Sequence, residues 1–264
     1  MVRSLRSWSL PLLLAVPCAT AACGDNGADP DAGDPAADAT AGPDAIVLDA
    51  SPDAMATLPL AGFGDLTGMC DLLDEPDLIG TAPELFSVDL SFPRRYVDPD
   101  DRPLLTPGGL EMILVGNAGG SSVYSEVFAY EVLARCDLAS LLKTETEIVY
   151  DVDGKKTDML VEVDGHKIGV SVTRAVTFPF GDPYTLDAAT TLIQRKLDDI
   201  LLSSAEVSAA DHWDKQILAI LAYDDQHAQV AAEAWAALDD ATRADTIVII
   251  IPTGGDDLFI YTDQ

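Results

Sequence analysis

The stretch DMLVEVDGHKIGVSVT, residues 158–173, decides how the folded part of this chain is built. Apolar and polar residues alternate on both sides of Asp164-Gly165, a pair that favours a two-residue hairpin turn. With that turn, Val163 lies opposite His166, and each step back along the first strand matches one step forward along the second. Asp158 therefore lies opposite Ser171. Side chains alternate between the faces of a strand, so Ser171 and Thr173 share one face. We therefore expect Asp158, Ser171 and Thr173 to converge at one end of the hairpin.

Helices and further strands are expected on both sides of this hairpin. Apolar residues recur at helical spacing before and after it, and continuous apolar runs typical of strands covered on both faces follow. The expected elements are a helix over 123–137, strands over 147–151, 158–163 and 166–173, a helix over 186–200, a strand over 217–223, a helix over 226–238, and strands over 246–251 and 258–261. This order predicts an α/β sandwich in which an antiparallel hairpin leads into strands joined through helices.

The arrangement resembles a known superfamily. A helix with an acid, a strand, an Asp that opens a hairpin, a strand with two polar residues one apart, and a second helix are similar to the PD-(D/E)XK, or restriction-endonuclease-like, nucleases. The resemblance covers about residues 119–223 and implies an α-β-β-β-α-β sandwich with a mixed central sheet over 119–264. In that family the helix acid, the hairpin Asp and the Glu of an E-x-K pair hold a divalent metal, and the Lys positions or activates water.

Two acidic positions carry over from the family pattern. Glu126, or alternatively Glu131, stands at the place of the helix acid, and Asp158 stands at the place of the hairpin Asp. Thr157, and not Pro, precedes that Asp. The resemblance therefore implies that Glu126 and Asp158 are the candidate metal ligands.

The remaining positions depart from the pattern. Ser171 stands where the family has Glu, and Thr173 stands where it has Lys. Gln194 and Lys196 lie on the following helix, where related nucleases sometimes place a supporting Gln or a relocated Lys. A serine offers only a neutral hydroxyl, and a threonine cannot stabilise charge as an ammonium does.

Two functions follow from this mixture of kept and lost positions. The first is a degenerate nuclease-like scaffold with a non-catalytic binding or structural role, which needs no cofactor. The second is a Mg²⁺-dependent phosphodiesterase or nuclease that uses Glu126 and Asp158, because Mg²⁺ usually takes one or two carboxylates and completes its shell with water and substrate phosphate.

The first residues predict export. Arg3 and Arg6 precede a short apolar stretch over residues 10–16, which is too short to span a bilayer, and small residues then lead to Cys23. The segment resembles a bacterial lipobox, with Thr20 where Leu is usual. We expect residues 1–22 to be a lipoprotein signal peptide and Cys23 to be the lipidation site; the alternative is an ordinary secretion signal cleaved at Ala-x-Ala.

A lipid on Cys23 would place the protein in the cell envelope, anchored to a membrane. Gly24, rather than Asp, follows that cysteine, which by analogy with known sorting rules favours the outer membrane. Residues 23–62 are rich in Asp, Ala, Gly and Pro and are expected to be a disordered linker, because they cannot bury enough apolar surface to offset chain entropy. Residues 63–118, with a strand-like alternation over 85–92, are expected to be an N-terminal elaboration of the domain.

The charge balance argues against nucleic acid as a partner. The formal net charge is −30, and the basic residues form no cluster larger than adjacent pairs such as Lys155-Lys156 and Arg195-Lys196. Such a protein repels phosphate backbones unless a local basic patch or bridging cations intervene. The expected partners are a membrane, through the lipid, and an unidentified protein.

Two cysteines lie beyond the lipidation site. Cys70 and Cys136 would form a disulfide in an oxidising export compartment, tying residues 63–120 to the C-terminal region. The alternative is two buried free thiols, since spacing alone does not show proximity.

Overall fold

The computed structural model describes residues 59–60, 64–68, 70–118 and 122–262. The predicted signal peptide, Cys23 and most of the predicted linker lie outside the described residues. Within the described ranges, no helix is long and apolar enough to cross a membrane.

The strands belong to one sheet with the order β1-β2-β3-β8-β7-β6-β5-β4. The strands are β1 (Pro59–Leu60), β2 (Gly64–Gly68), β3 (Glu84–Phe92), β4 (Ser140–Thr144), β5 (Met159–Val163), β6 (His166–Ala175), β7 (Lys215–Ala222) and β8 (Ile247–Gly255). The helices are α1 (Glu75–Ile79), α2 (Pro107–Val115), α3 (Val123–Cys136), α4 (Leu186–Glu206), α5 (Asp225–Ala237), α6 (Asp240–Arg243) and α7 (Leu258–Tyr261), with a 3₁₀ turn at Arg102–Leu104.

The sheet is mixed. Strands β3, β8, β7 and β6 run parallel to one another, whereas the pairs β6–β5 and β5–β4 at one side and β3–β2 and β2–β1 at the other are antiparallel. From α3 to β7 the elements follow the order α-β-β-β-α-β. The α/β sandwich with a mixed central sheet that the sequence predicts is therefore confirmed.

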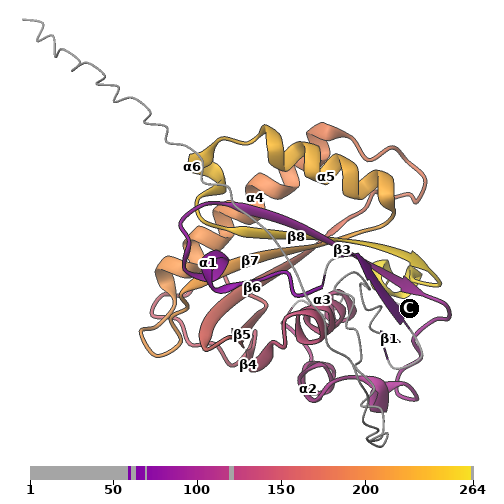
Figure 1. The fold of residues 1–264 in the computed structure, drawn as a ribbon, viewed down its shortest axis with the longest axis horizontal. Helices are drawn as coiled ribbons and strands as arrows, with labels where there is room; N and C mark the ends of the chain where they lie inside the picture. Colours follow the sequence, from indigo (N-terminus) through magenta and orange to yellow (C-terminus); the bar gives the residue numbers. More distant parts are fainter. Residues whose placement is uncertain (1–58, 61–63, 69, 119–121, 263–264) are drawn as a thin grey trace, which may run out of the picture. The chain divides into compact units, whose positions relative to one another are not determined.

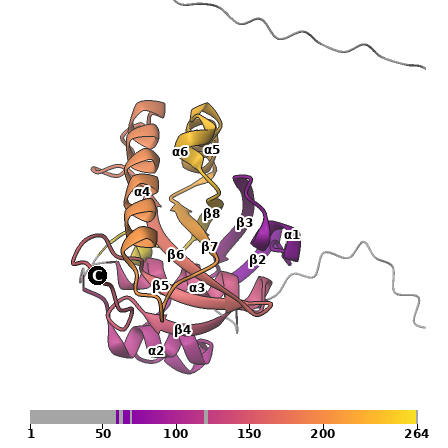
Figure 2. The same ribbon diagram turned by 90° about the vertical axis from the view of Figure 1, so that its left-hand side faces the viewer.

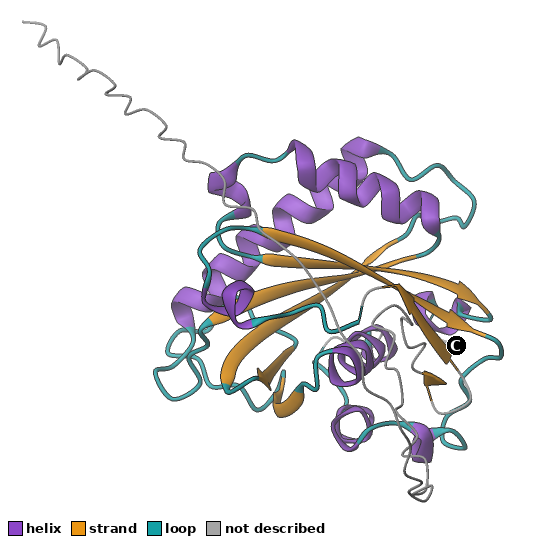
Figure 3. Ribbon diagram, in the orientation of Figure 1, coloured by secondary structure: helices purple, strands orange, loops and turns teal. Residues whose placement is uncertain are grey.

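Helices cover both faces of the sheet. Helices α4 and α5 lie on one face, and α2 and α3 lie on the other (Figures 1, 2 and 3). Val172, Ala219 and Ile249 belong to the core that includes α3, whereas Leu218 and Ile220 belong to the core under α4 and α5. Because successive side chains point to opposite faces, the central strands need apolar residues at every position, which explains their continuous apolar runs.

The hairpin has the predicted register. Val163 pairs with His166, and the pairing continues outward to Met159 and Val170. The turn residues Asp164 and Gly165 have φ of 49° and 83°, as a two-residue turn with both central residues in the left-handed region requires. Strand β6 continues five residues beyond that last pair, so its edge from 171 onward has no strand neighbour on the β5 side.

Two expected strands are wrong. Residues 147–151 are not a strand; β4 lies at Ser140–Thr144 instead, and the Glu147 carboxylate accepts hydrogen bonds from the amide and hydroxyl of Thr144, closing a turn. Residues 258–261 form helix α7, with Phe259, Ile260 and Tyr261 buried. Four residues are too few for periodicity to separate a strand from a helical turn.

Two strands of the region before α3, β2 and β3, belong to the same sheet. Strand β3 lies between β2 and β8 and pairs in parallel with β8, from Glu84 opposite Ile247 to Phe92 opposite Gly255. Its alternating pattern over 85–92 predicts the strand, and this prediction is confirmed.

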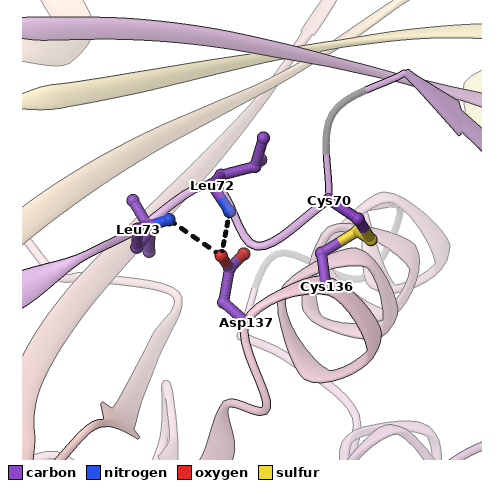
Figure 4. Close-up of a disulfide and its surroundings, with 5 residues drawn as sticks. All are labelled: Cys70, Leu72, Leu73, Cys136 and Asp137. Atoms are coloured by element: carbon purple, nitrogen blue, oxygen red, sulfur yellow. Dashed lines mark hydrogen bonds between the residues drawn. A yellow bond between two sulfur atoms is a disulfide. The ribbon is translucent and has the colours of Figure 1, made fainter. Parts of the chain in front are cut away.

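A disulfide joins this segment to the end of α3. Cys70 and Cys136 are bonded, with their Cα atoms 4.6 Å apart. Beside the bridge, one oxygen of the buried Asp137 accepts hydrogen bonds from the amides of Leu72 (2.6 Å) and Leu73 (2.9 Å), as Figure 4 shows. The covalent link and the carboxylate together fix the chain between β2 and α1 against α3.

Candidate functional site

The site forms at the end of β6 that extends beyond its pairing with β5. The Val172 amide donates to Asp158 Oδ2 at 2.5 Å, and the Lys196 ammonium donates to the Val172 carbonyl at 3.0 Å. The pairing between β5 and β6 does not extend past Val170, so the amide and the carbonyl of Val172 would otherwise lack a partner. Asp158 and Lys196 therefore substitute for the missing strand along the open edge of β6.

Glu126 reaches the site from the first turn of α3. It is buried, with 4% of its surface exposed, and its Oε1 accepts hydrogen bonds from Ser122 Oγ at 2.6 Å and Asn117 Nδ2 at 2.7 Å. Ser122 occupies the N-cap position of α3 but makes no side-chain bond to the helix backbone. Its hydroxyl is directed to Glu126 instead, so the loop before α3 holds this carboxylate in place.

The two carboxyl groups interact through their charges. Part of the Asp158 residue is accessible, but its carboxyl is enclosed by protein, and burial raises its pKa to about 7, with the Glu126 charge adding to the rise. Lys196 and the Val172 amide oppose this rise. Burial likewise raises the pKa of Glu126, against the hydrogen bonds from Ser122 and Asn117. The cluster thus holds two coupled carboxyls and one ammonium.

Ser171 and Thr173 are buried on the face of β6 that α4 and α5 cover. They pair in register with Leu218 and Ile220 of β7, whose side chains belong to the core under α4 and α5. Among the described residues, neither hydroxyl makes a hydrogen bond to Asp158 or Glu126. The two positions where the family has Glu and Lys are therefore neutral and take no part in the hydrogen bonding of the site.

The remaining candidates separate clearly. Lys196 contacts the site, whereas Gln194, two residues earlier on α4, is exposed. Glu131 is fully buried away from solvent, accepts from the amide and hydroxyl of Thr106, and pairs with Arg135 at 3.0 Å. Glu131 thus secures the start of α2 against α3, and Glu126 is the helix acid of the cluster.

Three residues of the site were not predicted as members. Asn117 and Ser122 donate hydrogen bonds to Glu126. Glu145, in the turn after β4, accepts from the Ala118 amide at 2.9 Å, and its charge helps to raise the pKa of both Glu126 and Asp158. A serine four residues before Glu126, at the start of a helix, is a usable sequence signal for such a partner. Glu145 carries no comparable signal, because its approach depends on how the β4–β5 connection folds.

The donor set differs from the one that the family resemblance implies for a metal. In the described part of the chain, no group of three or more His, Cys, Asp or Glu side chains is arranged to hold a metal ion. The third carboxylate is replaced by Ser171, and Lys196 already donates to backbone. The residues present do not form the three-carboxylate ligand set of a resident divalent ion.

Comparisons with known proteins add little to this picture. No protein-family model matches the chain. A Dictyostelium discoideum protein described as AAC-rich mRNA clone AAC4 protein is 35% identical over 153 residues, which is 56% of this chain and 22% of that protein. The chain thus spans less than a quarter of that relative's length. Among solved structures, Pyrococcus furiosus SfsA in complex with Ca²⁺ is similar at a TM-score of 0.28 and 12% identity, over 51% of this chain and 57% of that one.

Proposed function

We propose that this chain is an exported, lipid-anchored protein of the cell envelope, in which a nuclease-like α/β domain has a non-catalytic binding role. The domain has the element order of the nuclease sandwich. The residues at the positions that would carry the chemistry make hydrogen bonds within the fold instead. Cys23 carries the anchor, and residues 23–62 separate the domain from the membrane.

This proposal rests on the bonds of Asp158 and Lys196 to the backbone of Val172, by which the two side chains cap the open edge of β6. Each satisfies one backbone group of Val172 at the open edge of β6, and Glu126 is engaged by Ser122 and Asn117. A catalytic metal site would need these groups free to meet the ion and the substrate phosphate. Buried polar groups that satisfy one another are instead typical of a structural network.

Two properties of the whole chain support export and a protein partner. The Cys70–Cys136 bridge is typical of oxidising compartments outside the cytosol. The net charge of −30 disfavours binding to phosphate backbones.

Calorimetric titration of the purified chain with Mg²⁺ and Mn²⁺ tests the non-catalytic role. We expect no saturable heat that depends on Asp158, so the wild type and an Asp158→Asn variant should give the same trace. Saturable binding that the variant abolishes would overturn the proposal, and a matched Asp214→Asn change at an exposed position controls for the loss of one negative charge.

A second candidate, a Mg²⁺-dependent phosphodiesterase, is favoured by one observation. The Glu126 carboxyl is close enough to Asp158 to raise the pKa of that aspartate, as expected for two groups that could share a cation. Cleavage of a plasmid or of bis(p-nitrophenyl) phosphate that requires Mg²⁺ and is lost in Asp158→Asn would establish this activity in place of the binding role.

The anchor is tested in a bacterial host that expresses the full chain. We expect the protein to partition into the detergent phase of a Triton X-114 extract and to carry the mass of lipid chains at Cys23. Cys23→Ser should move it to the aqueous phase, whereas Cys18→Ser should leave it membrane-bound. Aqueous partitioning of the wild type would indicate an ordinary secreted protein.

A further inference from the structure

An exposed aromatic surface lies beyond the carboxyl ends of β6 and β7. We call Phe178, Phe180 and Tyr223 the aromatic shelf. The Phe178 and Phe180 ring centroids are 4.8 Å apart, and Phe180 stacks on Tyr223 at 5.3 Å with 23° between the planes. Phe178 is 62% exposed and Phe180 is 38% exposed, so the shelf presents ring faces and edges to solvent.

Tyr223 connects the shelf to aromatic rings of the core. Tyr223 meets the rings of Tyr261 at 5.3 Å and His227 at 5.5 Å, both edge to face, and His227 stacks on the buried Tyr184 at 4.9 Å. The rings therefore form a continuous series from solvent into the core. A ring that is already packed against its neighbours, as Tyr223 is, loses little conformational entropy when a partner covers it.

Acidic side chains border the shelf. Asp224 and Asp225 directly follow Tyr223; the Asp224 side chain is half exposed, and Asp225 is exposed. The Asp225 charge also raises the pKa of Asp89 on β3, which shows that a third acid lies nearby. The loop that carries the two phenylalanines adds the exposed Asp182.

These acids have no basic neighbours in their own segments. Neither residues 175–194 nor residues 223–242 contain a Lys or Arg. Asp224 bonds to His227 of its own helix, through the backbone amide and the ring Nδ1. Residues 175–194 and 223–242 therefore supply no lysine or arginine partner to the acidic border, and the nearby Arg174, at the end of β6, donates to the Ile260 carbonyl.

The chain itself is poorly matched to cover this surface. Residues 24–60 contain several Asp and no Lys or Arg, and a second copy would bring another net charge of −30. Like charges brought together across an interface are unfavourable, so the electrostatics favour a basic occupant.

We propose that the aromatic shelf and its acidic border bind a basic segment of a partner protein, with an Arg or Lys side chain over the rings and its charge facing Asp224 and Asp225. Arginine in particular stacks on aromatic faces while pairing with carboxylates. This inference rests on the proposed binding role, for which it names the class of partner.

Peptide display on the full chain tests the proposal without assuming a sequence. From a library of random heptapeptides, we expect enrichment of sequences that place Arg or Lys beside an aliphatic or aromatic residue. A labelled synthetic peptide of the enriched sequence then gives the affinity by fluorescence anisotropy, and its affinity should fall as salt is added. Absence of enrichment, or enrichment of acidic sequences, would overturn the proposal.

Variants place the binding on the shelf. Phe178→Ser together with Phe180→Ser should weaken the peptide about tenfold or more, as loss of a hot spot does, and Asp225→Asn should weaken it less. Phe178→Ser alone serves if the double variant does not fold. Matched changes on α4, Leu201→Ser with Leu202→Ser and Asp198→Asn, are at exposed positions and should leave the affinity unchanged. Unchanged affinity in the shelf variants would refute the assignment.

Two further outcomes separate this inference from its alternatives. Self-association in sedimentation that Phe178→Ser abolishes would assign the shelf to a second copy and overturn the basic partner. Peptide failure together with the absence of Asp158-dependent metal binding would reject the shelf alone, whereas Asp158-dependent metal binding would reject the proposed non-catalytic role.

Discussion

Asp137 is a buried carboxyl whose two oxygens have different surroundings. Oδ1 accepts from the amides of Leu72 and Leu73, whereas Oδ2 is buried without a hydrogen-bond partner among the described residues. Burial outweighs these two hydrogen bonds and raises the pKa of Asp137 to about 6. Compared with the unfolded chain, the folded protein therefore disfavours the charged form of Asp137.

This shift gives a pH prediction with a definite sign. The folded state keeps the Asp137 proton up to a higher pH than the unfolded state. Protonated Asp137 therefore adds to the free energy of unfolding at low pH, and this stabilisation is lost as the pH rises through about 6. We expect the free energy of unfolding to fall by about 1–2 kcal/mol from this group between about pH 4 and pH 7. Urea titrations of the wild type and Asp137→Asn isolate the effect, since Asn keeps the acceptor for both amides. Identical pH slopes in the two proteins would contradict it.

Asp158 gives a second prediction at this scale, based on its role as a cap. Asp158→Ala should be less stable than Asp158→Asn by about 1–2 kcal/mol, because alanine leaves the Val172 amide unpaired whereas asparagine can still accept from it. Urea unfolding at about pH 8 compares the two variants with the wild type. Equal stabilities would show that the carboxyl is not needed as a cap and would shift attention to ligand binding.

The sequence predicts the position of Asp158 but not its use. The hairpin register follows from the turn at Asp164 and Gly165 and needs only local information. What the carboxyl contacts depends on β5 beginning only at Met159 while β6 runs on to Ala175, and on α4 supplying Lys196. The lengths of neighbouring strands are set by tertiary packing, which one sequence does not display.

The same contrast holds among elements. Long helices and buried strands have strong periodicity and overlap the predicted ranges, although α4 runs on to Glu206 and β8 to Gly255. The strand expected over 147–151 fails because side chains take its backbone bonds: the Val149 amide donates to Asp211 Oδ2 at 2.8 Å, and Glu147 closes the turn at Thr144. Competition of polar side chains for the backbone is invisible to a pattern of apolar residues.

The hairpin turn can be tested as an element. Gly165 has φ of 83°, and a Cβ there would meet open space, so backbone strain is the effect of adding one. We expect Gly165→Ala to lower the free energy of unfolding by about 1 kcal/mol. Gly254→Ala, also in open space but without a positive φ, is the matched control and should change stability little. Equal effects of the two substitutions would contradict the strain argument.

The bridge between β2 and α3 makes a larger prediction. Cys70 and Cys136 are separated by 66 residues, so reduction enlarges the conformational freedom of the unfolded chain. We expect Cys70→Ser with Cys136→Ser to lower the free energy of unfolding by about 2–4 kcal/mol. Dithiothreitol should destabilise the wild type by a similar amount and leave the double variant unaffected. A double variant as stable as the oxidised wild type would show that the bridge does not stabilise the fold.

At the scale of the molecule, the sheet depends on pairings far apart in the sequence. Strand β3 occupies an interior place beside β8, although its Glu84 and the paired Ile247 are 163 positions apart (247 − 84) in the sequence. Alternation predicts that 85–92 is a strand, but carries no information about which strand it joins. Parallel partners in particular leave no local turn signal.

The net charge of −30 makes the last prediction. Mutual repulsion among acidic groups opposes the compact state and is screened by salt, so raising NaCl to about 0.3 M should increase the free energy of unfolding. At equal ionic strength, any additional stabilisation by MgCl₂ should be the same in the wild type and in Glu126→Gln with Asp158→Asn, because screening needs no specific ligands. If the variant alone lost the additional stabilisation, Mg²⁺ would be bound by Glu126 and Asp158, since a ligand that binds only the folded state stabilises it in proportion to its affinity. The comparison therefore separates diffuse electrostatics from a metal site in a single set of urea titrations.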